Sequence, residues 1–423
     1  MKIAVVGAGI AGLGAAWLLS RRHEVVIYER EGRFGGHAYT VGVRTEAGPR
    51  PVDVGFIVFN ERNYPNLVAL FDHLGVPTEE SDMSFAVSLD HGRFEYASSF
   101  GGYIAQRSNL VRPSFLRMSR DILRFNRLAP CLLDKCEELD FTIGHFVAEA
   151  DLSDAFRDRY LLPMAACIWS TPLGCMLDYP AQTFVRFFNN HGLLTIGPHL
   201  RWRTVSGGSR AYVERLAGCL RATARLGSPA VTVRRTLAGV EIRDSAGHWD
   251  GFDKVVMACH ADQALTLLGD ADALERALLG RFGYSRNEIW LHEDTRLMPR
   301  RRSVWSSWNY VADGRERDGP VSVTYWMNRL QNLAPSPPLL VSVNPTQAPR
   351  PASVHARFDF DHPMYDATAI RAQGELHTIQ GRRDIYFCGS YCGDGFHEDA
   401  LCAGLDVAEQ LGVRRPWRAA GPP

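Results

Sequence analysis

The opening stretch of the chain, KIAVVGAGIAGLGAAWLLSRRHEVVIYE, constrains the fold more than any other feature of the sequence. Residues 3–6 form a short apolar run, which is typical of a parallel strand buried on both faces. Gly7, Gly9 and Gly12 then form GxGxxG where a helix begins, and a second apolar strand ends at Glu29. Strand, glycine turn, helix and acidic strand end together are the fingerprint of a dinucleotide-binding unit. The sequence therefore predicts a Rossmann-like α/β domain.

Each residue of this fingerprint has a physical role in binding a dinucleotide. The first glycine permits the tight turn, the second lets the backbone approach the pyrophosphate, and the third allows the helix to pack closely. The N-terminus of the helix stabilises the phosphate charge. Glu29 would accept hydrogen bonds from the ribose hydroxyls of the adenosine half, and it would repel a 2′-phosphate.

A second pair of glycines favours FAD over a nicotinamide dinucleotide. Gly35 and Gly36 follow Glu29 closely and precede His37. This pattern resembles the second half of the FAD motif in flavoproteins of the amine oxidase and phytoene desaturase type, where the paired glycines bring backbone against the phosphates. The alternative is an ordinary glycine turn. GxGxxG occurs only once in the chain, so a separate NADPH domain is not expected.

The stretch GSYCGDGFHEDALCAG at residues 389–404 could be a metal site, since it contains cysteines, a histidine and several carboxylates. The spacing of Cys392, His397 and Asp399 matches no common zinc site, so we predict no metal. The stretch instead predicts a strand that ends at Gly389, a glycine-rich turn, and a helix that starts near Glu398. Small residues on one face and a C-cap glycine are expected in this helix: Ala400, Ala403, Gly404, Ala408 and Gly412.

This C-terminal stretch resembles the closing FAD motif of the same superfamily. The resemblance implies that the positive end of the helix points at the pyrimidine edge of the flavin, where negative charge gathers on reduction. His397 is then the side chain expected nearest the isoalloxazine, and the alternative is a histidine that bonds backbone in a tight turn. Relatives usually carry an acid directly after the strand glycine. Ser390 stands there, so the ribityl contact is weaker or is made by Asp394.

The similarity continues through VDVGFIVFNERNYPNL, YLLPMAACIWSTP, WRTVSGGSRAYV, VVMACHADQAL, SSWNY and TYWMNRLQNL. These segments resemble a bacterial branch of FAD-dependent oxidoreductases that accompany, or are fused to, cyclopropane fatty-acid synthases. The resemblance implies an α/β fold in which a discontinuous Rossmann-like FAD-binding domain holds an inserted α+β substrate domain. The FAD-binding pieces are expected at 1–85, 205–265 and 375–415, and the substrate domain at 86–204 and 266–374, with a mainly helical part at 113–200.

The resemblance also implies a set of site residues around non-covalently bound FAD. Gly55 and Phe56 would lie near the flavin, and Val231 would contact adenine through its backbone. His397 and Tyr325 are the candidate catalytic residues. The full set expected to bind the cofactor is Gly7, Ala8, Gly9, Ala11, Gly12, Glu29, Arg30, Gly35, Gly36, His37, Gly55, Phe56, Val231, Gly389, Ser390, Glu398, Asp399 and Ala400.

The composition argues against several classes of function. The 423 residues include 47 basic and 47 acidic side chains, so the net charge of zero gives no reason to expect a nucleic-acid partner. The nine cysteines are scattered without a CxxC pair, which suits a reducing cytoplasm. No run of about 20 apolar residues occurs, so no helix is expected to span a membrane.

Residues 113–130, PSFLRMSRDILRFNRLAP, predict a helix with two different faces. Such a helix suits peripheral contact with an anionic bilayer on the inner side of the membrane, with its apolar side chains in the acyl boundary. The alternative is a helix that packs within the protein and leaves its arginines solvated. The apolar face consists of Phe115, Met118, Ile122 and Phe125, and the basic face of Arg117, Arg120, Arg124 and Arg127.

The expected reaction is removal of hydride from a hydrophobic substrate, namely a methylated or cyclopropane fatty acyl chain of a membrane phospholipid. A new double bond would form, and His397 would accept the proton from the adjacent carbon. Three alternatives stay open. They are an oxidase of a soluble amine or aromatic metabolite, an isomerisation or saturation without net oxidation, and a flavin-binding partner that supports a lipid methyltransferase.

The amine alternative has little support from the residues. Amine oxidases of this superfamily typically use a lysine that holds a water near the flavin. The chain contains only Lys2, Lys135 and Lys254, and neither Lys135 nor Lys254 is expected at that place. Tyr325 and Trp326 are the one aromatic pair that could form an amine cage.

Overall fold

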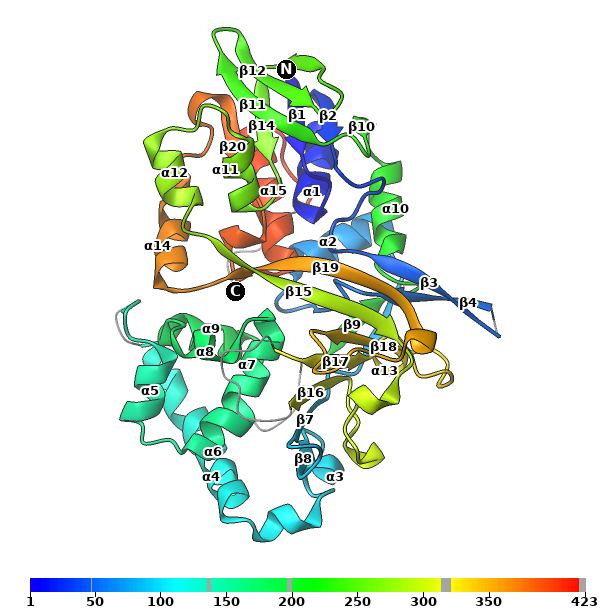
Figure 1. Cartoon of the computed structure of the whole chain (residues 1–423). Coiled ribbons are helices and arrows are strands. Elements are labelled where there is room, and N and C mark those ends of the chain that lie inside the picture. Colours follow the sequence, from blue (N-terminus) through cyan, green and yellow to red (C-terminus); the bar gives the residue numbers. More distant parts are fainter. Residues whose placement is uncertain (47, 135–137, 196–199, 313–320, 418–423) are drawn as a thin grey trace.

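Two lobes follow one another along the molecule (Figure 1). The upper lobe contains a parallel sheet with its helices, and the lower lobe contains a larger mixed sheet beside a group of helices. This arrangement confirms the predicted α/β fold with an inserted α+β part. The computed structural model describes residues 1–46, 48–134, 138–195, 200–312 and 321–417.

The upper lobe is built around a five-stranded parallel sheet. Its strands come from three separate segments of the chain, and all of them lie inside the pieces predicted for FAD binding. The domain boundaries themselves stay a prediction. In spatial order the strands are β10 (Thr223–Arg225), β2 (Glu24–Tyr28), β1 (Lys2–Val6), β14 (Lys254–Met257) and β20 (Ile385–Phe387).

Both faces of this sheet are covered, which explains why its strands are apolar without alternation. Ile3 and Val5 pack with α1 (Ile10–Leu19) and α15 (His397–Gln410). Ala4 and Val6 pack with the opposite layer, because successive side chains of a strand point to opposite faces. That layer consists of the antiparallel strands β11 (Ala230–Thr236), β12 (Gly239–Asp244) and β13 (Trp249–Phe252) with the helices α11 (Ala261–Leu267), α12 (Ala273–Leu279) and α14 (Ala367–Glu375).

Helices α1 and α15 pack so closely that the backbone of one lies against the backbone of the other. A Cβ atom added to Gly404 would lie 2.1 Å from the carbonyl oxygen of Ala11, so this position requires glycine. The small residues predicted on one face of α15 therefore serve its contact with α1. The helix begins one residue before the predicted Glu398, and its C-cap is Leu411 rather than Gly412, which follows with φ of +87°.

The lower lobe contains a seven-stranded mixed sheet. Its strands β16 and β7 pair in parallel, and the other neighbours pair antiparallel. The two long strands β15 and β19 lie where the lobes meet (Figure 1). In spatial order the strands are β19 (Val354–Met364), β15 (Gly283–His292), β18 (Leu340–Val343), β17 (Val323–Trp326), β16 (Trp308–Ala312), β7 (Phe85–Leu89) and β8 (Phe94–Ala97).

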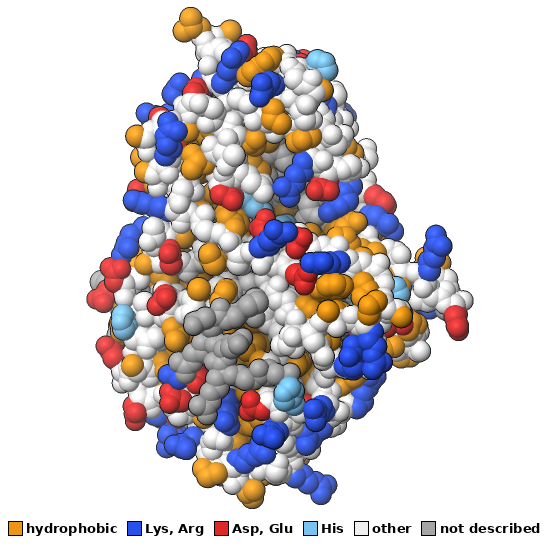
Figure 2. All heavy atoms as spheres, in the orientation of Figure 1, with side chains coloured by type: hydrophobic (Ala, Val, Ile, Leu, Met, Phe, Trp, Pro, Cys, Tyr) orange, Lys and Arg blue, Asp and Glu red, His pale blue; other side chains and the backbone are white. Residues whose placement is uncertain are grey.

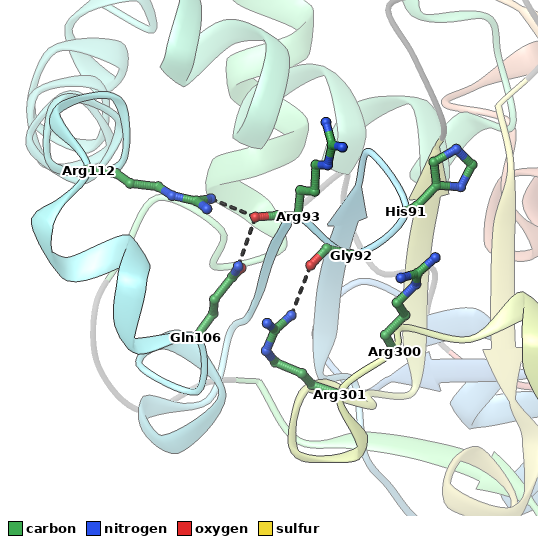
Figure 3. A pocket seen from close by; sticks show the side chains of 7 residues that line it. All are labelled: His91, Gly92, Arg93, Gln106, Arg112, Arg300 and Arg301. Carbon is green, nitrogen blue, oxygen red and sulfur yellow. Dashed lines mark hydrogen bonds between the residues drawn. The ribbon is translucent and has the colours of Figure 1, made fainter.

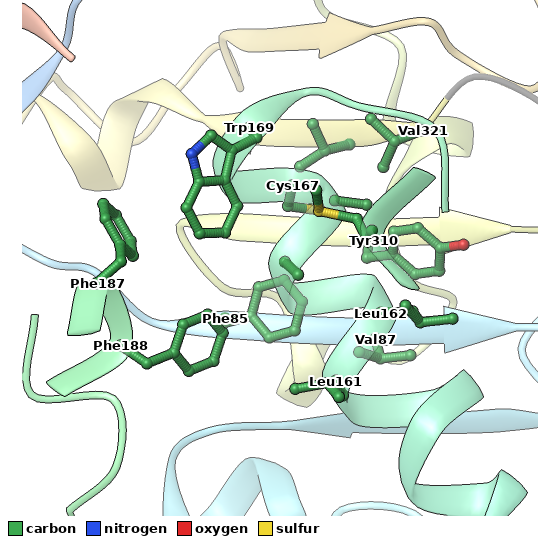
Figure 4. Packing of buried hydrophobic residues seen from close by; sticks show 14 of the residues in the cluster. Phe85, Val87, Leu161, Leu162, Cys167, Trp169, Phe187, Phe188, Tyr310 and Val321 are labelled. Atoms are coloured by element: carbon green, nitrogen blue, oxygen red, sulfur yellow. The ribbon is translucent and has the colours of Figure 1, made fainter. Parts of the chain in front are cut away.

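A group of helices packs beside this sheet. They are α4 (Pro113–Leu128), α5 (Ile143–Glu149), α6 (Asp154–Phe156), α7 (Leu162–Trp169), α8 (Leu173–Leu177) and α9 (Ala181–Asn190), and a π-helical turn η3 (Arg157–Leu161) joins α6 to α7. Figure 4 shows Cys167 and Trp169 of α7 and Phe187 of α9 in the apolar core that also contains Phe85 and Tyr310 of the sheet. Burial of these side chains fixes the helices to the sheet.

Shorter elements complete the described part of the chain. The strands β3 (Thr40–Thr45) and β4 (Gly48–Asp53) form a ribbon, and β5 (Val58–Asn60), β9 (Trp202–Val205) and β6 (Thr78–Ser81) form a small sheet. The other α-helices are α2 (Pro65–Leu74), α3 (Phe100–Tyr103), α10 (Arg210–Gly218) and α13 (Met327–Leu330). The 3-10 turns are η1 (Arg107–Val111), η2 (Ala129–Leu132), η4 (Thr295–Leu297), η5 (Arg302–Val304), η6 (Pro351–Ser353), η7 (Leu376–Thr378), η8 (Arg382–Asp384) and η9 (Ser390–Cys392).

The helix predicted at 113–130 exists as α4, but its apolar face is buried in the protein. Phe115, Met118 and Phe125 are at most 1% exposed and belong to the core of the lower lobe. The prediction that this face enters a bilayer is wrong, because the protein itself already covers it. The alternative of a packing helix holds for these residues. In the described residues, no helix has both the length and the apolar character to cross a membrane.

A buried carboxylate joins three elements that are distant in the sequence. Asp53, at the end of β4, is 1% exposed. It accepts hydrogen bonds from the hydroxyl of Thr40 at 2.5 Å, the backbone N–H of Ser209 at 2.9 Å and the side-chain amide of Gln331 at 2.9 Å. Burial raises the pKa of Asp53 to about 6, although the bonds from Thr40 and Ser209 lower it.

We expect the contribution of Asp53 to stability to depend on pH. Its carboxyl binds a proton more tightly in the folded state, with a pKa of about 6, than in the unfolded state, with the ordinary value of 3.8. The contribution is therefore fully present below the ordinary value and is lost as the pH rises through about 6. The unfolding free energy of the wild type minus that of Asp53→Asn should fall by about 2–3 kcal/mol between pH 4 and pH 7.

Urea unfolding of both proteins at several pH values measures this difference. Asp72→Asn is the control, because Asp72 lies on the exposed side of α2. The difference between the wild type and the control should stay level. A level difference for Asp53→Asn as well would contradict the prediction.

Candidate active site

A cavity of about 900 Å³ runs from the glycine fingerprint of the upper lobe into the lower lobe. Its dinucleotide end is lined by the turn after β1 and by Glu29. Its middle is lined by Gly55, Phe56 and Ser390. We call its far part the apolar end, which consists of Met83, Phe85, Met164, Ile168, Trp308 and Tyr325. The volume is of the size that proteins use for cofactors and small ligands.

The three fingerprint glycines are required for different reasons. A Cβ atom on Gly12 would lie 2.0 Å from the carbonyl oxygen of Gly7, so the helix can pack on the turn only with glycine there. Gly7 has φ of +105°, and its Cβ atom would lie 2.6 Å from the carbonyl oxygen of Ala258. Gly9 has no atom within 4 Å of such a Cβ, so it faces open space in the cavity. This is the place at which the fingerprint predicts a pyrophosphate.

The second glycine pair lies directly against this turn. The backbone N–H of Gly35 donates to the carbonyl of Ala8 at 2.9 Å. Gly36 has φ of +55°, and a Cβ atom there would lie 3.0 Å from the Cα of Gly9. The two glycine motifs, predicted as halves of one FAD site, thus form adjacent walls of one cavity.

Glu29 closes the dinucleotide end. Its side chain is 8% exposed and accepts hydrogen bonds from the backbone N–H groups of Ala8 at 2.7 Å and Glu31 at 2.8 Å. The carboxylate is thereby held at the carboxyl end of β2, where the adenosine ribose of a dinucleotide is expected. Pro229 and Ala230 line the same cavity, whereas the neighbouring Val231 has a 40% exposed side chain and is not part of the wall.

Most residues expected to bind the cofactor line this cavity. Gly12 does not, because it supports the turn from behind. The lining members of the set are Gly7, Ala8, Gly9, Ala11, Glu29, Arg30, Gly35, Gly36, His37, Gly55, Phe56, Gly389, Ser390 and Ala400, and the others are Gly12, Val231, Glu398 and Asp399.

Glu398 has a structural partner that the sequence does not reveal. Its carboxylate accepts hydrogen bonds from the backbone N–H groups of Asn66 at 2.8 Å and Leu67 at 2.9 Å, at the start of α2. It therefore caps α2 and is not directed at the cavity. Asp399 accepts from the backbone N–H of Phe396 at 2.8 Å, and burial together with the carboxylate of Asp394 raises the pKa of Asp399.

His397 lines the cavity but is already engaged by its neighbours. Its Nε2 lies 2.5 Å from the hydroxyl of Tyr212, and its ring stacks on Phe56 with the centroids 3.9 Å apart. Burial lowers the pKa of His397 to about 3, so the imidazole is neutral at ordinary pH. The partner of the ring is a side chain rather than the backbone of the turn. The role of His397 as a proton acceptor stays a prediction.

Three further histidines lie along the cavity wall. The ring centroid of His37 is 5.6 Å from that of His362 and 6.1 Å from that of His260. Burial lowers the pKa of His37 and of His260, and it lowers that of His362 to about 4. The Nδ1 of His362 accepts from the amide of Asn287 at 2.9 Å. The sequence does not reveal this group, because its members are more than 100 residues apart and no local pattern joins His260 or His362 to the glycine motifs.

The aromatic pair at the cavity differs from the predicted one. Tyr325 and Trp308 are cross-strand neighbours, with their rings 4.9 Å apart at 81°. Trp326 follows Tyr325 on β17 and so points to the other face of the sheet, where its ring contacts Trp305. Tyr325 and Trp326 therefore cannot form one cage. Period-two alternation along a strand would have indicated this from the sequence.

The lysines of the described chain lie away from the cavity. Lys254, on β14, forms an ion pair with Asp384. Lys2 lies over the ring of Phe252. Lys135 is outside the described residues. Within the described ranges, no group of three histidine, cysteine or carboxylate side chains is arranged to hold a metal ion.

Comparison with known proteins identifies the family. The family model for flavin containing amine oxidoreductases matches residues 10–350. The chain belongs to the flavin-containing amine oxidoreductase family. The FAD cofactor, the oxidoreductase class and the amine oxidase and phytoene desaturase superfamily predicted from the sequence are thereby confirmed.

Individual relatives are distant. A 4,4′-diapophytoene desaturase (4,4′-diaponeurosporene-forming) from Staphylococcus aureus is 28% identical over 191 residues, which cover 38% of this chain and 38% of the relative. A CLA-producing fatty acid isomerase from P. acnes has a TM-score of 0.70 and 17% identity, covering 97% of this chain and 98% of that one. A putrescine oxidase bound to putrescine has a TM-score of 0.68 and 15% identity, covering 98% and 100%. These structures share the fold of this family member.

The residues present fit FAD. Gly9 faces open space, Glu29 is held at the ribose position, and the Nε2 of His37 is buried without a hydrogen-bond partner. An unpaired buried polar atom on a cavity wall is a group that a bound ligand can satisfy. Gly35 and Gly36 would bring backbone against the phosphates, and Gly55 and Phe56 would lie beside the flavin.

We expect two glycine variants of this flavoprotein to fail in different ways. Gly9→Ala places its methyl group in open space, so the apoprotein should keep its stability while the affinity for FAD falls at least about tenfold, or ~1.4 kcal/mol. Gly12→Ala pushes α1 away from the turn, so both the stability and the affinity should fall. Urea unfolding of the apoprotein and titration with FAD, followed by flavin fluorescence, measure the two effects.

Gly32→Ala is the control, because Gly32 is exposed and its Cβ atom would meet nothing within 4 Å. It should bind FAD like the wild type. Unchanged FAD affinity in Gly9→Ala would contradict the assignment of this space to the cofactor.

Proposed function

We propose that the protein oxidises a fatty acyl chain by removing hydride and leaving a carbon–carbon double bond. The observation that carries this proposal is the apolar end of the cavity, which continues directly from the cofactor end. Its walls come from β7, β16, β17 and α7 and from Met83, which precedes β7, and none of the residues that they contribute is charged. An extended apolar chain could enter such a space without leaving a polar group unpaired.

The same walls give little support to a small amine as substrate. A cationic amine would lose hydration in the cavity and would need a carboxylate nearby. The acidic residues of the cavity wall belong instead to the cofactor side and to the strand between the lobes. They are Glu29, Glu31, Asp262, Asp359 and Asp361. No described lysine lines the cavity, so a lysine-held water is not part of the proposal.

Two relatives favour an apolar substrate by the names they carry. One is the desaturase from Staphylococcus aureus, and the other is the fatty acid isomerase from P. acnes. The second name also favours an isomerisation as a second candidate, in which hydride returns to another carbon of the same chain. An isomerase would turn over without an external electron acceptor, whereas a desaturase would not. The association with a lipid methyltransferase or a cyclopropane fatty-acid synthase stays a prediction.

Different parts of the site have different roles in the proposed reaction. FAD, when bound, supplies the hydride acceptor. The apolar end would position the acyl chain and exclude water. One hydride leaves one carbon, a proton leaves the adjacent carbon, and a double bond forms between the two. His397 is the proposed proton acceptor. A weak base suffices, because loss of hydride makes the neighbouring C–H strongly acidic.

The proposal predicts that an acyl lipid reduces the bound flavin. We expect anaerobic addition of phospholipids with methyl-branched or cyclopropane acyl chains to bleach the visible flavin band of the purified protein. Ile168→Lys would place an ammonium group in the apolar end and should slow this bleaching at least about tenfold. Met164→Leu, one helical turn earlier, is the control and should behave like the wild type.

Other outcomes would contradict the proposal. A flavin that stays oxidised with lipids but bleaches with small amines would identify an amine oxidase. A protein that no substrate reduces, and that purifies with a methyltransferase, would identify an accessory partner. Equal bleaching in Ile168→Lys would show that the apolar end does not hold the substrate.

We expect the role of His397 to be visible in the rate of flavin reduction. Because burial lowers the pKa of His397 to about 3, the neutral base is present throughout, and the wild-type rate should stay level between pH 5 and pH 9. His397→Asn should slow the reduction at least about 100-fold if the imidazole accepts the proton. Tyr212→Phe removes the bond to Nε2 but keeps the imidazole, so it should slow the reduction much less. Equal rates of flavin reduction in both variants would show that His397 has only a structural role.

A further inference from the structure

One end of the molecule exposes apolar side chains that the core does not use. Of the twelve large hydrophobic residues that are exposed among the described residues, six lie between positions 100 and 123. Phe100 is 84% and Val111 is 80% exposed. We call these six the apolar tip: Phe100, Ile104, Leu110, Val111, Leu116 and Leu123. They belong to α3 and its C-cap, to η1 and to α4, which form the lower end of the molecule in Figure 1.

Two residues of the apolar tip, Leu116 and Leu123, lie on the side of α4 that does not face the core. Leu116 and Leu123 are seven residues apart on one face and are 53% and 56% exposed. Arg117 and Arg127 are exposed on the same helix, and neither has an ion-pair partner in the described part of the chain. Figure 2 shows basic side chains gathered around apolar ones at this end of the molecule. Exposed apolar side chains that form one patch rimmed by polar residues mark interaction sites in many proteins.

A basic pocket adjoins the apolar tip. It has a volume of about 460 Å³ and lies between the turn after β7, the start of η1 and the segment before η5. Figure 3 shows its side chains, four of which are arginines. The lining residues are His91, Gly92, Arg93, Gln106, Arg112, Arg300 and Arg301.

The pocket is held together by hydrogen bonds that include two of its own arginines, Arg112 and Arg301. Glu95 is fully buried and accepts from the backbone N–H of Arg300 at 2.7 Å and from the guanidinium of Arg301 at 2.7 Å. The amide of Gln106 donates to the carbonyl of Arg93 at 2.8 Å. Among the described residues, the guanidinium groups of Arg93 and Arg300 have no hydrogen-bond or carboxylate partner. They are therefore available to an anion.

The chemistry of the two features identifies one kind of partner. Guanidinium groups bind phosphate oxygens, and a helix with exposed leucines and arginines suits the boundary between headgroups and acyl chains. A nucleic acid or a soluble phosphate compound would use the pocket but would leave the apolar tip in water. A bilayer surface with anionic phospholipids satisfies both at once.

We propose that the apolar tip and the basic pocket together dock the protein on a bilayer that contains anionic phospholipid. Phe100, Val111 and Leu116 enter the acyl boundary, while Arg93 and Arg300 bind headgroup phosphate. Within this surface, Leu116 lies on the opposite side of α4 from the face that the sequence predicts for membrane contact. Docking is separate from the proposed function, since a docked protein could act on another substrate and an acyl oxidase could act on dispersed lipid.

The test is co-sedimentation of the FAD-loaded protein with vesicles. Vesicles of phosphatidylglycerol and phosphatidylcholine should carry the protein down, and vesicles of phosphatidylcholine alone should not. Because the charge attraction is screened, 0.5 M salt should release most of the protein. The double variant Phe100→Ser/Val111→Ser and the double variant Arg93→Glu/Arg300→Glu should each weaken the binding at least about tenfold.

Matched controls lie at the far end of the molecule. Leu237→Ser removes an equally exposed apolar side chain from the turn between β11 and β12, and Arg276→Glu reverses an exposed charge on α12. Both should bind vesicles like the wild type. The visible flavin spectrum of each variant verifies that it is folded and loaded, since all the changed side chains are exposed.

Several results would overturn the proposal. Equal binding to both kinds of vesicle would exclude a role of the pocket in the contact. Unchanged binding in either double variant would exclude the side chains changed in that variant. Binding of millimolar glycerol phosphate by a protein that binds neither kind of vesicle would assign the pocket to a soluble phosphate compound. A dimer that Phe100→Ser/Val111→Ser dissociates, without vesicle binding, would assign the tip to a second copy of the chain.

Failure of lipids to bleach the flavin would contradict the proposed function but would leave a positive vesicle result intact.

Discussion

The close contact between α1 and α15 is the constraint on which the cofactor site depends. Gly404 meets the carbonyl of Ala11, and Gly12 meets the carbonyl of Gly7, so two successive layers of backbone touch without side chains between them. This stacking fixes the N-terminus of α1 relative to the N-terminus of α15. The two positive helix ends then face one cavity from opposite parts of the sequence. A side chain at either glycine would meet backbone and push the packed segments apart, so it would disturb the cofactor site without touching a ligand.

Buried polar groups connect the two lobes, and one cavity is lined by residues of both. Asp53 connects the β3–β4 ribbon to the start of α10 and to Gln331 after α13. The cavity wall crosses the same junction, where Phe358 and Phe360 of β19 contact the rings of Tyr39 and His37. The cofactor end and the apolar end therefore belong to one continuous cavity. Position, rather than a particular reactive side chain, is what this architecture supplies most directly.

The sequence predicted the parts of the site that depend on local pattern. GxGxxG after a strand, the second glycine pair and the C-terminal strand–turn–helix each specify backbone geometry, and all three line or support the cavity. It could not predict contacts between distant segments. Glu398 looked like a helix-end acid near the flavin, but its partner Asn66 lies 332 residues away and makes it the cap of α2. His260 and His362 join His37 only through the fold, for the same reason.

The helix α4 shows a further limit of periodicity. The spacing of Phe115, Met118 and Phe125 correctly indicated a face that avoids water, but hydrophobic period cannot distinguish a protein core from a lipid phase. The two cases can be distinguished only by the side chains that stay exposed once the core has formed. On α4 the remaining side carries Leu116 and Leu123 among arginines, a combination that a packing helix does not need. Leu116 and Leu123 are therefore the part of α4 that the proposed membrane contact would cover.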